Sequence, residues 1–476
     1  MMQNRTKLFF ENILVYGLGG MISKLIPFIM LPIITRLYPN SEYIGLNDLS
    51  TTFVQFAVAI AVCGMYDAMF RLFFDDDKLE AQQKVCSTAL IFVTSITVAL
   101  SVLCYLFRYQ IARIYFGGEQ YVYLVMITVI GFLVSSTNQI VSAPTRIQNK
   151  RKVFLVTNTI SPLISYSVAI PLIFKGYYIF AMPIATIIAG VTLEVAFGFM
   201  NMKFFKVSSF DKNRLKDLLK IGLPLMPNFI VYWIYNSSDK VMISHLLNSS
   251  ATGVYSVASR IGHISNLIYT AFAGGWLYFA YSTMNDADQV QMKSNMFEYL
   301  GAVSFAATVA LMSIVRVGFK ILFPAEYFAG YLVTPYLFLA PLLLMLYQVI
   351  ANQFTIVKKT YMNLVTLSTG AVLNVILNLT LIPILGIEGA SVATLIGYSC
   401  SIVICIVVLR KMELIFVNCK LFISTVLFMI YFILWRFMFN DNQIISIVAG
   451  IIVEGIYLYF YREFVIVAIK KLLKKK

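Results

Sequence analysis

Two cations, Lys24 and Arg260, lie deep inside apolar stretches of the sequence. A charge at the centre of a bilayer costs roughly 2.5–3.5 kcal/mol on insertion scales, so each cation indicates a protein interior or a water-filled cavity. Lys24 follows Gly17 and Gly20 at helical spacing, and Arg260 shares a helical face with His263. Arg binds phosphate oxygens in a bidentate manner, and Lys adds a mobile point charge. The two residues are therefore candidates for holding an anion, and a diphosphate suits them best.

Other polar side chains on helical faces complete the predicted cavity, and each has a structural alternative. Lys240 could pair with a neighbouring group or reach the membrane interface, because its side chain is long. Asp67 could form an i,i+4 ion pair with Arg71. His263 could be a hydrogen-bonded packing residue, and the asparagines could bond neighbouring helices. Beyond the two cations, the candidate cavity residues are Lys240, Asp239, His263, Asn374 and Asn378, and the candidates for ion coupling are Asp48, Asp67 and Asp239.

The composition argues against a His-cluster metal site, a Ser-His-Asp hydrolase and a nucleotide hydrolase with a phosphate loop. The chain has 476 residues, of which 60% are hydrophobic and 12% are charged, whereas an average soluble domain has about 25% charged residues. It contains 2 His, 6 scattered Cys and no Gly-rich phosphate loop with Lys and Ser or Thr. We therefore expect a polytopic membrane protein that is not an enzyme and has no catalytic residue, metal or cofactor.

The apolar stretches fall into fourteen predicted spans. A helix needs about 20 apolar residues to cross the hydrocarbon layer. The second and eighth stretches are longer than that, which predicts that they tilt or protrude. The spans are 11–37, 43–74, 84–107, 121–142, 153–174, 178–202, 217–243, 251–282, 298–323, 332–357, 361–383, 388–410, 416–438 and 443–468.

Positive charge predicts the orientation of these spans. Most of the 37 Lys and Arg residues lie at one set of span ends, which include both termini. Basic loops stay on the cytoplasmic side, so both termini are expected to be cytoplasmic. The net charge of +15 is explained by the basic residues of the cytoplasmic loops, which face anionic lipid headgroups. It therefore requires no nucleic-acid partner.

A repeat with an offset of 208 residues relates the two halves of the chain. Gly45 lines up with Gly253, and Ala185-Thr186 lines up with Ala393-Thr394. Six spans per repeat is an even number, so the two repeats are parallel, and transporters of this kind bind substrate between their halves. The predicted domains are an N-lobe at 1–202, a basic cytoplasmic linker at 203–220 that starts an interfacial helix, a C-lobe at 217–412, and the last two spans with a Lys-rich cytoplasmic tail at 413–476.

Three stretches resemble polysaccharide-unit flippases of the Wzx type, which belong to the multidrug/oligosaccharidyl-lipid/polysaccharide (MOP) exporter superfamily. Residues 31–45 resemble the end of the family's first span, and residues 252–260 resemble the matching place in its second lobe. The strongest stretch is 373–394, which is similar to the pattern Leu-Asn…Leu-Asn…Pro…Gly-Ile-x-Gly-Ala-x-x-Ala-Thr. The resemblance implies an all-α membrane protein of about 14 transmembrane helices, with two parallel six-helix lobes in a V-shaped, MATE-like bundle plus two C-terminal helices.

The same resemblance implies a function. Such proteins move an undecaprenyl-diphosphate-linked oligosaccharide unit across the bacterial inner membrane by alternating access, for O-antigen, capsule or a similar polymer. Cations on spans 1 and 8 of better understood relatives are taken to hold the diphosphate, and Lys24 and Arg260 lie on those spans here. The sequence departs from the family in having Lys24 in place of the commoner Arg, and an extra Ile44 before Gly45. Membrane lipids are expected partners, as is the polymerase of the pathway.

Two other functions compete with the flippase. A multidrug or cation antiporter of the same superfamily would need an acidic, aromatic cavity, which the surplus of deep cations argues against. A polymerase or ligase of the same pathway would need a large periplasmic loop with Arg or His, and the longest outside loop expected here is about a dozen residues long.

Overall fold

The structure is a computed structural model that describes residues 24–463 and 466, without the side chains at 271, 274–275 and 277–278. These residues form helices and short connections, with no strand among them. The chain divides into two compact units, an N-terminal unit (Met1–Ser256) and a C-terminal unit (Val257–Lys476). This division follows compactness rather than the sequence repeat, so the predicted lobe boundaries at 203–220 and 412 stay predictions.

Twelve helices in the described part of the chain are long and apolar enough to cross a membrane. They coincide with the predicted spans except for the first and the eighth. Only residues 24–37 of the first predicted span are described as helix, and its glycines at 17, 19 and 20 lie outside the described residues. The eighth is divided by a 3-10 turn into α12 (Ser249–Gly262) and α13 (Asn266–Ser282), and each of these two helices alone is too short to be counted as a membrane span. The fold is thus the predicted all-α, multi-pass membrane fold.

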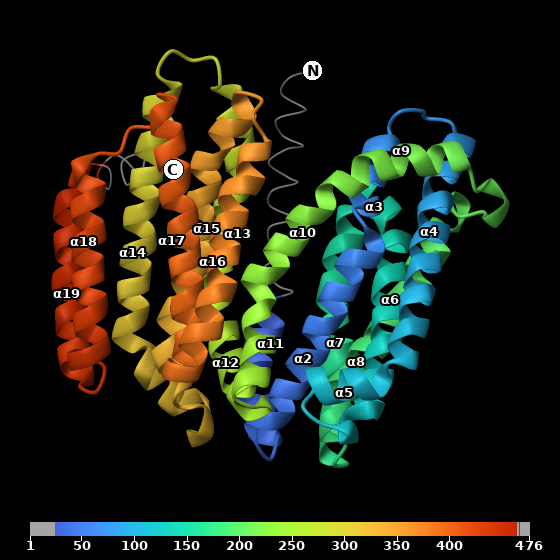
Figure 1. The fold of residues 1–476 in the computed structure, drawn as a ribbon, viewed down its shortest axis with the longest axis horizontal. Helices are drawn as coiled ribbons and strands as arrows, with labels where there is room; N and C mark the ends of the chain where they lie inside the picture. The colour runs from blue at the N-terminus through green and yellow to red at the C-terminus, as the bar shows by residue number, and fades with distance from the viewer. Residues whose placement is uncertain (1–23, 464–465, 467–476) are drawn as a thin grey trace. The chain divides into compact units, whose positions relative to one another are not determined.

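The N-terminal unit contains the helices of the first repeat (Figure 1). Helix α8 packs against both α6 and α7, and α6 packs in turn against α2 and α4. The helices after the first one are α2 (Ser41–Val62), α3 (Met65–Leu72), α4 (Leu79–Leu106), α5 (Arg108–Tyr115), α6 (Val122–Ile147), α7 (Arg151–Phe174) and α8 (Tyr178–Asn201).

The second predicted span is broken rather than tilted as one long helix. Helix α2 ends at Val62, and α3 begins at Met65 after two residues in the left-handed region, Cys63 (φ 50°) and Gly64 (φ 70°). A Cβ atom at Gly64 would lie 2.4 Å from the carbonyl oxygen of Gly222. Glycine is needed here both for the backbone conformation and for this close approach.

A helix begins within the basic linker, where the sequence predicts one, and its place at the membrane interface stays a prediction. Helix α9 (Lys212–Gly222) crosses the ends of α3 and α4 (Figure 1). Asp211 caps it, because its Oδ1 accepts hydrogen bonds from the backbone N–H of Asn213 (2.8 Å) and Arg214 (3.2 Å). These bonds satisfy two of the four N–H groups that the first helical turn leaves without a partner.

The seventh span continues from α9 and changes its helical pitch near its end. Helix α10 (Met226–Trp233) passes into a π-helical turn, η5 (Ile234–Ser238), and then into α11 (Asp239–Leu246). Single π-turns inside α-helices often occur at functional sites. This one directly precedes the two charged residues Asp239 and Lys240.

The helix boundaries repeat with the predicted offset. Helices α2 and α12 begin at Ser41 and Ser249, which are 208 residues apart. Helix α6 begins at Val122, and α15 begins at Gly330, the same number of residues later. The sequence repeat therefore reflects two copies of one helical arrangement.

The C-terminal unit is built around one buried helix, α15. This helix packs against α13, α14 and α17, and α14 also packs against α18 and α19. The helices that follow α13 are α14 (Gln289–Leu322), α15 (Gly330–Ile356), α16 (Tyr361–Leu385), α17 (Ile387–Lys411), α18 (Cys419–Leu434), the π-helical turn η8 (Trp435–Phe439) and α19 (Gln443–Phe460).

Candidate functional site

A buried ion pair joins spans 2 and 7 in the N-terminal unit. The Nζ atom of Lys240 on α11 lies 2.5 Å from Oδ2 of Asp48 on α2. The side chains are 17% and 6% exposed, so both charges are largely removed from solvent. Two buried charges stay ionised only when each compensates the other. The structural alternative for Lys240, pairing with a carboxylate, is therefore the observed one, and its partner is Asp48.

Asp239 is held by a second contact next to this pair. The hydroxyl of Tyr255 on α12 donates a 2.7 Å hydrogen bond to Oδ2 of Asp239. Both residues are buried. Helix α11 thus places two adjacent charged residues against two different helices, α2 and α12.

Two glycines bring α2 and α12 together beside these contacts. A Cβ atom at Gly45 would lie 1.9 Å from the carbonyl oxygen of Ser249, and one at Gly253 would lie 1.9 Å from that of Ser41. Gly45 and Gly253 are equivalent in the repeat, and so are Ser41 and Ser249. The contact therefore follows the symmetry of the repeat, which explains why a glycine recurs after 208 residues.

The two cations predicted to bind the anion belong to different units, Lys24 to the N-terminal unit and Arg260 to the C-terminal unit. Lys24 lies at the start of the described part of the first helix, and its side chain is exposed. Arg260 is half-buried in the last turn of α12, and His263 begins the 3-10 turn that follows. Their role in a shared cavity stays a prediction.

The asparagines of span 11 bond helices to one another. Asn374 on α16 donates a 3.1 Å hydrogen bond to Oγ1 of Thr394 on α17, and Asn378 donates one of 3.2 Å to Oδ1 of Asn374. Both asparagine side chains are fully buried. These contacts favour the packing alternative over a direct contact with substrate.

Asp67 does not form the predicted ion pair with Arg71. Arg71 pairs with Asp75, four residues in the other direction, and Asp67 is exposed on α3. Both carboxylates have the i,i+4 spacing, so spacing alone could not select between them. Asp75 lies beyond the end of α3, where the backbone can bring its carboxylate to the guanidinium.

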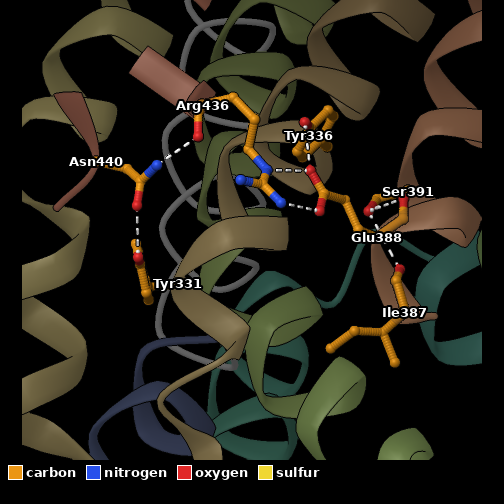
Figure 2. A network of polar contacts seen from close by, with 7 residues as sticks. All are labelled: Tyr331, Tyr336, Ile387, Glu388, Ser391, Arg436 and Asn440. Carbon is orange, nitrogen blue, oxygen red and sulfur yellow. Dashed lines mark hydrogen bonds and ion pairs between the residues drawn. The ribbon is translucent and has the colours of Figure 1, made fainter. Parts of the chain in front are cut away.

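A polar network in the C-terminal unit was not predicted from the sequence. Figure 2 shows Arg436 in a bidentate pair with Glu388, at 2.5 Å and 2.7 Å, while Tyr336 donates a 2.8 Å hydrogen bond to the same carboxylate. In the same network, Tyr331 donates to Oδ1 of Asn440 at 2.8 Å. Arg436 follows α18, which has no counterpart in the first repeat, so the network fixes the appended helices to α15 and α17. The only sequence signal was a Glu and an Arg at span ends on the same predicted side.

Comparison with known proteins establishes the family. The model of a family described as "Polysaccharide biosynthesis protein" matches residues 33–322, which is more than half of the chain. The chain belongs to this family. The resemblance found in the sequence is confirmed at this level.

Solved structures confirm the fold. The chain is similar to "Lipid II flippase MurJ, inward closed conformation", with 17% identity, a TM-score of 0.73, and coverage of 95% of this chain and 100% of that one. It is also similar to an inward-facing MATE multidrug resistance transporter of the MOP superfamily, with 14% identity, a TM-score of 0.62, and coverage of 82% and 94%. An outward-facing MATE transporter gives 16% identity, a TM-score of 0.57, and coverage of 84% and 94%. No curated protein matches the chain.

Proposed function

We propose that this protein is a flippase that moves an undecaprenyl-diphosphate-linked oligosaccharide unit across the bacterial inner membrane, for O-antigen, capsule or a similar surface polymer. The match to the polysaccharide biosynthesis family, in a multi-pass membrane chain, carries the proposal. The likeness of its fold to that of a lipid II flippase, over 95% of the chain, supports it. A multidrug or cation antiporter is the alternative within the same fold.

In the proposed mechanism, the diphosphate pairs with Lys24 and Arg260 on the cytoplasmic side. The sugars enter a polar cavity, and the polyprenyl tail stays in the lipid. Alternating access then exposes the headgroup on the other side of the membrane. No bond of the substrate is made or broken.

The three candidate ion-coupling carboxylates differ in whether an existing contact must break before they can bind an ion. Asp48 is engaged by Lys240, so coupling to a proton or cation through Asp48 would require this pair to separate. Asp239 would likewise have to release Tyr255. Asp67 is exposed at the end of the unit that carries α9, where it can exchange ions without such a change.

The experiment that tests this function removes the two cations. Lys24→Ala, Arg260→Ala and the double variant should abolish export of the surface polymer in cells that lack the wild-type protein. Lys24→Arg should retain export, because it keeps the charge and has the residue that is commoner in the family. Lys152→Ala removes an exposed cation from the first turn of α7 and should leave export unchanged.

Two further measurements make the result decisive. Fluorescence-detected size exclusion checks that each variant is folded and present in the membrane fraction. A dye-efflux assay tests the antiporter alternative. Normal export by a folded double variant would overturn the role of the two cations, and dye efflux without any change in lipid-linked glycans would favour the antiporter.

A further inference from the structure

Two hollows in the N-terminal unit lie along one face of α6. The first, about 270 Å³, is bordered on α6 by Thr128, Gly131 and Ser135. The second, about 230 Å³, is bordered farther along the same helix by Asn138 and Ser142. These positions follow one another at steps of three or four residues, so they share one helical face. The two hollows therefore lie in line along α6, and both also border α8; we call them together the groove.

Between the two hollows, α8 packs closely against α6 at Gly190. Asn138 donates a 3.0 Å hydrogen bond to the carbonyl oxygen of Gly190. A Cβ atom at Gly190 would lie 2.9 Å from a methyl carbon of Val134, which borders the first hollow. A glycine at this position therefore allows the close approach of α6 and α8 between the two hollows.

Polar side chains are exposed along the first part of the groove. Thr51 and Gln55 of α2, Ser135 of α6 and Thr186 of α8 are all exposed, although each lies within a membrane-spanning helix. Thr51 and Thr186 donate to backbone carbonyl oxygens of their own helices, those of Asn47 (3.0 Å) and Pro183 (2.9 Å), and Gln55 accepts from Ser237 at 3.5 Å. These exposed side chains keep further hydrogen-bonding capacity, which water or a polar ligand satisfies and hydrocarbon does not.

The lining groups are of a kind that suits sugars. Hydroxyls and amides that donate and accept hydrogen bonds match the hydroxyls of an uncharged sugar. Arg146 is the single charged residue that borders either hollow, and it donates a 3.3 Å hydrogen bond to the hydroxyl of Tyr66. Tyr66 and Phe154 border the second hollow with their aromatic rings, against which the C–H face of a sugar ring can stack.

The second repeat provides an internal comparison. At the offset of 208 residues, most groove positions of α6 correspond to apolar residues of α15, the helix that begins at the equivalent place. The exceptions are Thr128 and Thr145, which correspond to Tyr336 and Gln353. Gly131 corresponds to Leu339, which is 4% exposed, and Ser135 corresponds to Leu343, which is 7% exposed. The positions after them continue the pattern: Asn138, Ser142 and Arg146 correspond to the buried Leu346, Ile350 and Phe354. The fold does not require a hollow here, because the second repeat fills the same helix face with large side chains.

We propose that this groove of the N-terminal unit, on α2, α3, α6, α7 and α8, binds the uncharged sugar part of the transported lipid. The inference rests on the proposed flippase function and names the sugar-binding part of the site. It assigns sugar recognition to the first repeat alone, separately from the cations that hold the diphosphate. Each hollow, about 270 and 230 Å³, is slightly smaller than ordinary ligand sites of about 300–1,000 Å³, which fits one part of a ligand rather than the whole of it.

The test fills the groove with the residue that the second repeat uses. A Cβ atom at Gly131 would lie 3.5 Å from Ile187 and 3.8 Å from Val54, which is ordinary van der Waals contact. Gly131→Ala therefore fits and leaves the hollow open, whereas the rest of the side chain in Gly131→Leu must occupy it. Ser135→Leu is a second filling variant, for use if Gly131→Leu does not yield folded protein.

Binding is measured in nanodiscs with two probes, undecaprenyl diphosphate and undecaprenyl-diphosphate N-acetylglucosamine. The wild type and Gly131→Ala should bind the glycosylated probe about tenfold more tightly than the bare one, as expected if the sugar gains one or two net hydrogen bonds. Both filling variants should bind the two probes equally and keep the wild-type affinity for undecaprenyl diphosphate.

The possible failures are distinguishable. If a folded filling variant keeps the tenfold preference for the glycosylated probe, or if the wild type has no such preference, the assignment of sugar binding to the groove is wrong. The proposed flippase function is not affected by either result. If the wild type binds neither probe, the proposed function fails, and the groove assignment fails with it.

Discussion

The ion pair between Asp48 and Lys240 allows a quantitative test of how the N-terminal unit is held together. Its nitrogen and oxygen atoms are 2.5 Å apart, and the two side chains are 17% and 6% exposed. Removing one partner from a buried pair costs about 3–5 kcal/mol, because the remaining charge loses its compensation. Replacing both partners with uncharged residues of similar size is often close to neutral. Asp48→Asn and Lys240→Met should therefore each destabilise the protein more than the double variant does.

The assay is a double-mutant cycle on the purified protein, measured as the shift in thermal unfolding in detergent. The interaction energy of the cycle should exceed ~1 kcal/mol, because residues in direct contact show coupling energies of this size. A matched control uses Lys84, which lies 3.9 Å from Asp211 with half of its side chain exposed. Lys84→Met should change the stability by less than ~1 kcal/mol, as for other surface pairs. Additive effects at Asp48 and Lys240 would refute the argument, because they would mean that the two charges do not compensate each other.

Two further predictions concern the helix contact and the helix cap. Gly45→Ala and Gly253→Ala should each destabilise the protein by about 1–3 kcal/mol, because the new Cβ atom meets a backbone carbonyl at 1.9 Å. The control is Gly198→Ala in α8, which has open space around it and should be neutral or stabilising by up to ~1 kcal/mol. Equal thermal stabilities of all three variants would contradict the contact. The N–H groups of Arg214 and Asn213 hold the pKa of the Asp211 carboxyl below its usual range. The contribution of the ionised carboxylate to the stability of the fold is therefore complete above a pH of about 4, and it is lost as the pH falls through the lowered pKa. Asp211→Ala should therefore cost ~1 kcal/mol at neutral pH, and its difference from wild type in thermal unfolding should shrink in acid; a difference independent of pH would show that the cap does not act through its charge.

Much of the fold could be predicted from the sequence, because it depends on local patterns. Long apolar runs predict spans, and the Asp before a basic amphipathic segment predicts the start of α9. The repeat of Gly45 and Gly253 was visible in the sequence, and the structure gives its physical reason in a shared helix contact.

The rest depends on contacts between residues that are far apart in the chain. Asp48 and Lys240 are 192 residues apart, so no spacing rule could pair them. The same holds for the pair of Glu388 with Arg436, which exists only because the last two spans are added to the second repeat. The break of span 2 depends on a close approach between Gly64 and Gly222, which hydropathy does not register.

The measurement that tests the central claim most directly is mass spectrometry of polyprenyl lipids from cells depleted of this protein and from complemented cells. The account predicts that one undecaprenyl-diphosphate oligosaccharide accumulates on depletion, at the cytoplasmic leaflet, and returns to its normal level on complementation. Unchanged lipid-linked glycans in the depleted cells would contradict the flippase function.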